Sequence, residues 1–410
     1  MKKGLLLSIV ASTMIFAGGD IAPVEPAAAA PAADCSDFYG SVGAYYQTVD
    51  VELTDGTTTV ENDGFFDKAS SKFDVTAVIG VEKTLFGGIG FGAEVAGWSR
   101  VSDSIALAHR SGNFDTKSGG ELSQLYITAS FGNTALKVGR FAIPGSLSPL
   151  LRTGTTAGVK DMTYDGLLIA NTDLADTTVY GVWAYRAGVR DVFTKLGLPG
   201  DETGAFALGF QYKGFANTTV TAVGYYGPEL FGADADAVAA ALTVNSKFGA
   251  YGVDAQVTYV TGQQTVAGTD DDATLTAALK VSGSFDAFDA WAMASYVNDG
   301  TNPSVLAGGS GSLLGDAIDH TSGEGFGIGG GVSAKVWTGK AYLNAGYVSY
   351  EDKGTVTDMT HAFAVVGYKF KVSNINFKAE YKYSKDEFTV APQTFELTGQ
   401  RIRLEATYKF

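Results

Sequence analysis

The chain ends on the stretch QRIRLEATYKF, residues 400–410, in which apolar and polar side chains alternate without a break. One set of alternate residues comprises Ile402, Leu404, Ala406, Tyr408 and Phe410. The other set comprises Arg401, Arg403, Glu405, Thr407 and Lys409. Because successive side chains of a strand point to opposite faces, the stretch predicts an amphipathic β-strand whose apolar face ends on an aromatic residue.

The opposite end of the chain has the pattern of an export signal. Lys2 and Lys3 precede an apolar run over residues 5–17, which is shorter than the about 20 residues of a membrane span and suits a secretory signal. Candidate cleavage sites follow Gly19, Ala30 and Ala33. We expect residues 1–33 to be a signal peptide with a Pro/Ala-rich processing region, and residues 34–410 to form a single domain.

The composition favours a membrane protein built from strands. The 410 residues include 53 Gly, 25 Phe and 20 Tyr, and 18% of the chain is charged. A transmembrane barrel strand needs only about 10 residues with every second one apolar, so such a chain carries no long apolar run. No segment after residue 33 has the sequence of a transmembrane helix. The net charge of −15 argues against nucleic acid as a partner, because phosphate binding needs a basic face.

The alternation of residues 400–410 recurs along the chain, for example over residues 72–83, 124–131 and 375–383. An Arg or Lys side chain that faces lipid at the midplane costs roughly 2–4 kcal/mol, so we expect the charged faces of these strands to point inward. An interior lined by Arg, Lys, Glu and Asp from many strands has to be hydrated. The pattern therefore predicts a water-filled barrel.

The connections between these segments alternate in length. Short ones contain Gly or Asn, as at residues 132–133 and 373–374, and longer polar ones lie between them, as at residues 142–160 and 385–398. Counting from Phe38 predicts an all-β antiparallel transmembrane barrel of about eighteen strands, with short periplasmic turns and long outer loops. Sixteen strands is the alternative, because residues 161–170 and 241–249 alternate weakly. Eighteen strands leave room for an aqueous channel.

Together, the export signal, the terminal Phe410, the strand rhythm and the acidic loops resemble a Gram-negative outer-membrane porin. The final strand resembles the C-terminal strand of outer-membrane barrels, whose last aromatic residue belongs to a signal read by the barrel-assembly machinery. That resemblance implies an assembly role for Tyr408 and Phe410.

A second resemblance lies at residues 136–141, LKVGRF, followed by Pro144 and the connection over residues 142–160. This stretch resembles the Gly-Arg strand before the third outer loop of OprD-like channels and of the Campylobacter-type major outer-membrane porin. In that family the third loop folds inward and forms the constriction. The resemblance implies Arg152, Lys160 and Asp161 as constriction candidates. The family's usual Thr-Pro after Gly-Arg is absent here.

Charged residues on the expected inner faces give two interpretations of the lumen. The arginines would form a basic track that holds anions or carboxylates along the pore: Arg140, Arg186, Arg401 and Arg403. The alternative is ordinary lumen polarity, in which carboxylates balance them: Glu94, Glu380 and Glu405. The loops carry most of the acid, and clustered carboxylates raise the local cation concentration at a pore mouth. This favours a mild cation preference.

The function expected from these patterns is passive diffusion of ions and small hydrophilic solutes through an outer-membrane channel. Two alternatives stay open: a channel specific for carboxylate-bearing solutes, and a structural or adhesive surface barrel. We expect no enzymatic activity, because the three histidines do not form an acid–base arrangement with the spacing that catalysis needs: His109, His320 and His361. No cofactor or metal is expected. Outer-membrane lipid, lipopolysaccharide and the assembly machinery are expected partners, and a homotrimer and a monomer are both compatible with the sequence.

Overall fold

A computed structural model of the protein describes residues 38–61, 64–67, 70–100, 118–151, 155–156, 160–161, 163–189, 192–196, 203–228, 236–261, 273–298, 324–351, 357–390 and 392–410. The expected signal peptide and its cleavage site lie outside these ranges. No helix in the described part of the chain is long and apolar enough to cross a membrane.

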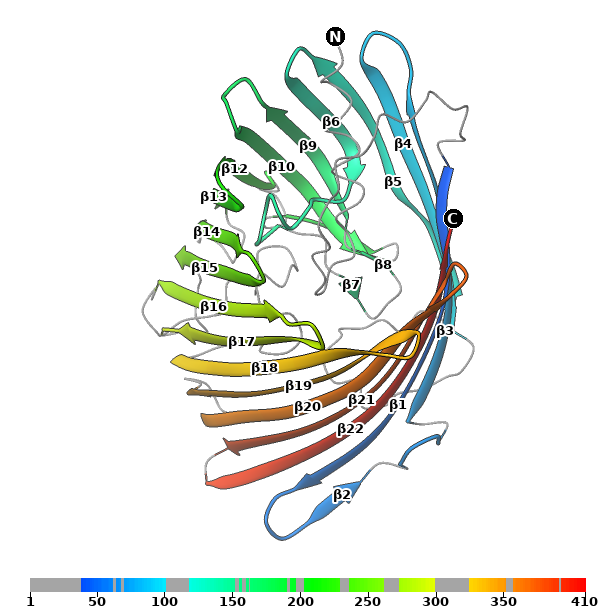
Figure 1. The fold of residues 1–410 in the computed structure, drawn as a ribbon, viewed down its shortest axis with the longest axis vertical. Coiled ribbons are helices and arrows are strands. Elements are labelled where there is room, and N and C mark those ends of the chain that lie inside the picture. The colour runs from blue at the N-terminus through cyan, green and yellow to red at the C-terminus, as the bar shows by residue number, and fades with distance from the viewer. Residues whose placement is uncertain are drawn as a thin grey trace.

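Eighteen antiparallel strands form one closed ring within the described ranges (Figure 1). They are β1 (Phe38–Thr54), β3 (Ser71–Thr84), β4 (Ile89–Arg100), β5 (Ser118–Phe131), β6 (Thr134–Phe141), β9 (Thr163–Asn171), β10 (Thr177–Val189), β12 (Ala205–Phe215), β13 (Thr218–Gly227), β14 (Ala237–Phe248), β15 (Tyr251–Thr261), β16 (Thr274–Ser284), β17 (Phe288–Val297), β18 (Glu324–Val336), β19 (Gly339–Glu351), β20 (Thr357–Val372), β21 (Ile375–Val390) and β22 (Gln393–Lys409). Four shorter strands are not members of the ring. β2 (Thr59–Glu61) pairs with β1, and β11 (Val192–Lys195) pairs with β10. β7 (Thr155–Thr156) and β8 (Lys160–Asp161) form a separate two-stranded sheet.

The prediction of an eighteen-stranded barrel is confirmed, and the sixteen-strand alternative is excluded. The two weakly alternating segments form β9 and most of β14. Each strand pairs with its neighbour in the chain, and β22 pairs with β1 to close the ring. At the seam, the amide of Gly40 donates to the Phe410 carbonyl at 3.0 Å, and the amide of Phe410 donates to the Gly40 carbonyl at 3.1 Å. The final strand is thus the one that closes the barrel.

The two ends of the barrel differ. At one end, called here the turn end, short turns such as residues 132–133 and 373–374 join the strands, and β1 begins and β22 ends there. At the other, the loop end, most connections are longer. The connection expected over residues 385–398 is an exception, because β21 and β22 continue as paired strands to the register pair Val390–Gln393. With 16 and 17 residues, both strands exceed the length needed to cross a bilayer.

Exposed aromatic side chains mark both ends of the outer surface. Those near the turn end are Phe38, Phe86, Phe131, Phe215, Phe248, Tyr251, Phe285, Phe288, Trp337, Tyr408 and Phe410. Those nearer the loop end are Trp183, Phe206, Tyr226, Tyr259, Tyr296, Phe326, Tyr347 and Tyr383. Aliphatic residues such as Leu208, Ile328 and Leu404 are exposed between them. Aromatic girdles that flank an apolar band are the outer surface of a transmembrane barrel.

Glycine in the strands makes room for aromatic rings on the inner face. A Cβ atom at Gly92 would lie 2.2 Å from the Tyr126 ring, and one at Gly367 would lie 2.2 Å from the Tyr342 ring. In each case the ring and the glycine are register partners on adjacent strands. Only glycine allows a neighbouring ring to lie flat across the strand at this distance.

Candidate functional site

The chain turns inward where β6 ends. Residues 142–151 leave the wall after Phe141, and the side chains of Ile143 and Leu150 are 0% exposed. They pack in one apolar cluster with Tyr180 of β10 and Tyr225 of β13. Beyond them, β7 and β8 pair with each other and project over the interior of the ring in Figure 1. The third loop-end connection therefore narrows the interior, as the resemblance implied.

Hydrogen bonds fix this segment to the wall. The Tyr225 hydroxyl lies 3.1 Å from Ser148 Oγ and accepts the Leu150 amide at 3.4 Å. The Gln211 side chain donates to the Ser146 carbonyl at 3.3 Å. The Tyr180 hydroxyl donates to the carbonyl of Leu147. Because these side chains come from β10, β12 and β13, the segment is held along three neighbouring strands.

The inner wall beneath the segment is apolar. Its buried side chains are mostly small: Tyr180, Val182, Ala184, Ala205, Ala207, Val223, Tyr225, Ala237, Ala239 and Ala241. The charged inner faces expected for many strands are absent from this sector of the described wall. Alanine on the inner face and large apolar residues such as Phe206 and Leu208 on the outer face leave these strands without polar alternation. The inward segment needs this surface, because its own apolar side chains must be buried against it.

A strip of basic residues lies on the inner face of β20, β21 and β22. We call it the basic strip and define it as Lys369, Lys378, Lys382, Arg401 and Arg403. Since β13 and β22 are nine positions apart in a ring of eighteen strands, this strip faces the wall that holds residues 142–151. The narrowed interior is thus apolar on one side and cationic on the other.

Two carboxylates lie among the side chains of the basic strip and contact them. Glu380 accepts contacts from Lys378 at 2.8 Å and from Arg401 at 3.3 Å. Glu405 lies 3.6 Å from Lys378 and 3.8 Å from Arg403. Three of the five cations thus contact these two carboxylates, which are outnumbered by the basic residues of the strip.

Two cations of the basic strip lie over aromatic rings and make cation–π contacts. Arg403 lies 5.2 Å from the Tyr45 ring centroid, and Lys369 lies 5.2 Å from that of Tyr342. At the turn end of the strip, a hollow of about 400 Å³ is lined by four lysines and Glu405. The lysines are Lys340, Lys369, Lys371 and Lys378. Such a surface attracts anions in a hydrated channel.

Carboxylates gather on the inner face of β3 and β4. Glu94 is buried and accepts the Tyr39 hydroxyl at 3.2 Å, and the Ser123 hydroxyl also donates to it. The Tyr126 hydroxyl donates to Glu82, and Lys137 lies 4.0 Å from the Tyr126 ring centroid. Within the described ranges no group of three or more His, Cys, Asp or Glu side chains is placed to hold a metal ion.

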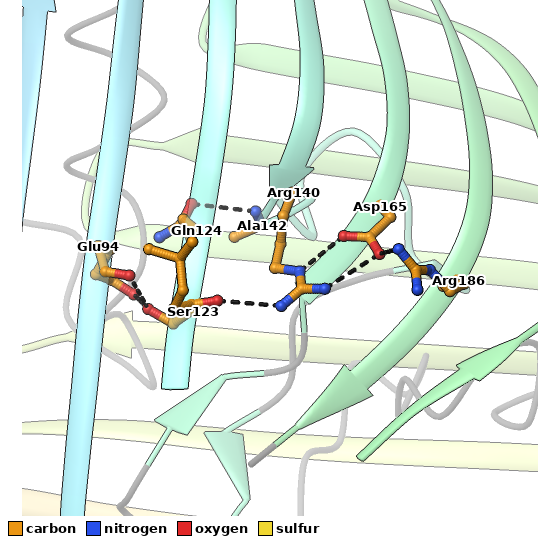
Figure 2. A network of polar contacts seen from close by, with 8 residues as sticks. Glu94, Ser123, Gln124, Arg140, Ala142, Asp165 and Arg186 are labelled. Carbon is orange, nitrogen blue, oxygen red and sulfur yellow. Dashed lines mark hydrogen bonds and ion pairs between the residues drawn. The ribbon is translucent and has the colours of Figure 1, made fainter. Parts of the chain in front are cut away.

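The structure separates the four arginines of the expected basic track. Arg401 and Arg403 lie on the inner face, whereas Arg140 and Arg186 lie on the outer face and share Asp165 (Figure 2). Arg140 follows the exposed Val138 by two residues, so strand alternation directs both outward. For Arg186 the cause is a bulge between Ala184 and Arg186, which reverses the alternation of β10.

The remaining site residues expected from the sequence belong to the third loop-end connection and to the C-terminal strand. Arg152 lies outside the described residues, and Lys160 and Asp161 form β8. Tyr408 and Phe410 are exposed on the outer face at the turn end, where their rings stack at 5.9 Å. No sequence pattern indicated a role for Tyr180, Gln211 and Tyr225, which hold the inward segment, because their partners are 33 to 77 residues away.

No family model and no curated protein matches this sequence. Solved structures do match its fold. OpdL of Pseudomonas aeruginosa is 15% identical over 92% of this chain and 99% of its own, with a TM-score of 0.62. A BenF-like porin from Pseudomonas fluorescens Pf-5 is 13% identical over 91% of this chain and 98% of its own, with a TM-score of 0.66.

A third similar structure is that of Pseudomonas aeruginosa OpdK with vanillate, which is 13% identical over 91% of this chain and 98% of its own, with a TM-score of 0.62. At such identities the likeness concerns the course of the backbone and not individual side chains. This chain therefore has the barrel fold of these porins.

Proposed function

We propose that this protein is an outer-membrane porin, a water-filled channel for passive diffusion of ions and small hydrophilic solutes. The observation that carries the proposal is the barrel interior, in which an inward segment on one wall faces charged side chains on the other. A closed wall with an apolar outer band suits a bilayer, and charged residues inside need water. The fold shared with solved porins supports the same function.

In this proposal the turn end faces the periplasm and the loop end faces outward, as in outer-membrane barrels. Residues 1–33 direct export, and Tyr408 and Phe410 belong to the assembly signal. Residues 142–160 form the constriction, with Arg152, Lys160 and Asp161 as its charged candidates. The acidic loops and the net charge of −15 favour a mild cation preference.

Liposome swelling tests the channel directly. Mature protein is reconstituted into liposomes, which are then placed in isotonic solutions of neutral sugars of increasing size. We expect swelling whose rate falls as the sugar grows, because the inward segment restricts the lumen. Liposomes with heat-unfolded protein are the control. Absence of swelling for every sugar, with barrel protein present in the liposomes, would favour a structural or adhesive barrel instead.

A second candidate function is a channel specific for carboxylate-bearing solutes. The basic strip favours it, since Arg401 and Arg403 keep their charge in any environment and bind carboxylates. The structure of OpdK with vanillate supports this candidate, because vanillate carries a carboxylate. Saturable block of KCl conductance by an aromatic carboxylate, but not by its neutral amide, would distinguish the specific channel from the general one.

A further inference from the structure

The hollow at the turn end of the basic strip has a row of lysines on its wall. Lys340, Lys369 and Lys378 are successive register partners on β19, β20 and β21. Lys371 lies on the same face of β20, two residues closer to the turn. Like charges directly opposite each other on paired strands destabilise a sheet. The barrel thus holds an unfavourable row of ammonium groups at this mouth of the lumen.

Carboxylates engage the two outer lysines of this row. Lys340 Nζ lies 2.8 Å from Asp289. Lys378 Nζ lies 3.6 Å from Glu405, which also lies 3.8 Å from Arg403. Glu405 lines the hollow, but its carboxylate is shared between two cations before any solute binds.

The two lysines of β20 are not engaged in this way. Within the described ranges, neither Lys369 nor Lys371 forms an ion pair with a carboxylate, and both are exposed. Lys369 lies 5.2 Å from the Tyr342 ring centroid. The ring attracts the cation but accepts none of the strong hydrogen bonds that a carboxylate would accept. The ammonium groups of both lysines therefore keep donors for a solute.

Neutral donors lie beside the lysines. The hollow has a volume of about 400 Å³, and Thr338, Asn376 and Thr407 also line it. Asn376 pairs with Lys371 on one side and with Thr407 on the other, so these residues form a second row next to the lysines. The Cα atoms of Lys369 and Lys371 are about 7 Å apart along one strand, so both four-carbon stems can reach one solute group. This arrangement suits a compact anion with several acceptor oxygens.

We propose that this hollow binds a phosphate group, as inorganic phosphate or as a phosphate monoester, with Lys369 and Lys371 as its main ligands. Lysine binds phosphate as a point charge, and two ammonium groups balance the charge of about −1.5 to −2 that a phosphate monoester carries at pH 7. A carboxylate carries a single charge and is bound in a paired fashion by arginine. Arg401 and Arg403 lie farther from the turn end and already contact carboxylates.

In the proposed orientation the hollow opens toward the periplasm. The inference rests on the proposed function, because an open lumen gives solutes access to the hollow, and it names a class of solute for that channel. Binding itself does not require conduction and can be measured apart from it.

Isothermal titration calorimetry of the folded mature barrel in detergent tests the proposal, with inorganic phosphate and glycerol 3-phosphate as separate probes. We expect the dissociation constant to rise about tenfold or more in Lys369→Gln/Lys371→Gln, because the loss of a charge-assisted hydrogen bond weakens binding by about this factor. Lys369→Arg/Lys371→Arg keeps both charges and should bind nearly as tightly as the native protein. Affinity for both probes supports a general phosphate site, and affinity for the ester alone supports a site for organic phosphates.

The matched control is Lys83→Gln/Lys213→Gln, which removes the same charge from exposed positions at the turn end. It should bind both probes as the native protein does. Equal affinities of the Lys369→Gln/Lys371→Gln variant and the control would overturn the proposal. Absence of binding to the native barrel, or competition by acetate as strong as that by phosphate, would overturn it too.

Single-channel conductance of the same samples separates failure of this site from failure of the channel. A conducting barrel without lysine-dependent phosphate binding rejects only the phosphate site. A barrel that binds phosphate through these lysines but does not conduct rejects only the channel.

Discussion

The hydroxyl of Tyr225 lies 3.1 Å from Ser148 Oγ and so joins the barrel wall to the inward segment across 77 residues of chain. Tyr225 belongs to strand β13 and Ser148 to the connection that follows β6, and their contact is buried. It turns a long loop into a fixed lining of the lumen. We expect the width of the proposed channel to depend on this attachment.

Removing the Tyr225 hydroxyl should loosen the inward segment. In Tyr225→Phe, the buried Leu150 amide loses its acceptor, which costs about 1–3 kcal/mol. We expect larger current fluctuations and a higher mean conductance in single-channel recordings. Tyr251→Phe is the control, because Tyr251 is exposed on the outer face. If both variants conduct like the native protein, the Tyr225 contact does not set the channel width.

Neutralising part of the basic strip should change ion selectivity. We expect Arg401→Gln/Arg403→Gln to shift the reversal potential in a KCl gradient toward greater cation preference, because two fixed positive charges leave the lumen wall. The shift should shrink at 1 M salt, where the screening length is about 3 Å. The control Lys83→Gln/Lys213→Gln should leave the reversal potential unchanged. An unchanged potential in the strip variant would mean that ions do not pass near β22.

Replacing a glycine that lies against an aromatic ring on the inner face should destabilise the barrel. In Gly367→Ala the new Cβ would lie 2.2 Å from the Tyr342 ring, so the ring must leave its position. Overpacking of this kind costs about 1–3 kcal/mol, which should lower the urea midpoint of unfolding. Gly97→Ala is the control, since its Cβ would meet nothing nearer than 3.8 Å. Equal midpoints for the two variants would show that Tyr342 repacks without cost.

The terminal aromatic should matter more in cells than in the purified barrel. Phe410 is 54% exposed, so Phe410→Ala removes few buried contacts. If Phe410 belongs to the assembly signal, the variant should show less folded protein in the outer membrane but a nearly native urea midpoint after refolding in detergent. Phe131→Ala, at another exposed turn-end position, is the control. Equal losses in cells for both variants would argue against a signal role.

Sequence patterns predicted the barrel well where the two faces of a strand differ. The stretch 400–410 predicted β22 because Leu404 faces outward and Arg403 inward, and the same logic gave the strand count. Sequence patterns did not predict the inner wall of β12–β14, because Ala205 and Ala207 stand there in place of the polar residues that alternate with apolar ones in other strands. Those alanines are explained only by the inward segment that covers them, and its packing is a long-range contact.

The predictions that Arg140 and Arg186 face the lumen were wrong for different reasons. The exposed Val138 shares a face with Arg140, so strict alternation alone would have placed Arg140 outside. For Arg186 no pattern sufficed, because the bulge at Tyr185 reverses the face of every later residue in β10. A charge near the loop end is tolerated outside the barrel when a carboxylate pairs with it, as Asp165 does here.

The central claim is that the barrel encloses an open aqueous channel, and single-channel recording in a planar bilayer tests it most directly. With purified mature protein and a tenfold KCl gradient, we predict steady openings on the nanosiemens scale and a reversal potential of cation sign. Openings of anion sign would keep the channel and favour the carboxylate-specific alternative. Folded protein that inserts into the bilayer yet produces no openings at any voltage would contradict the account.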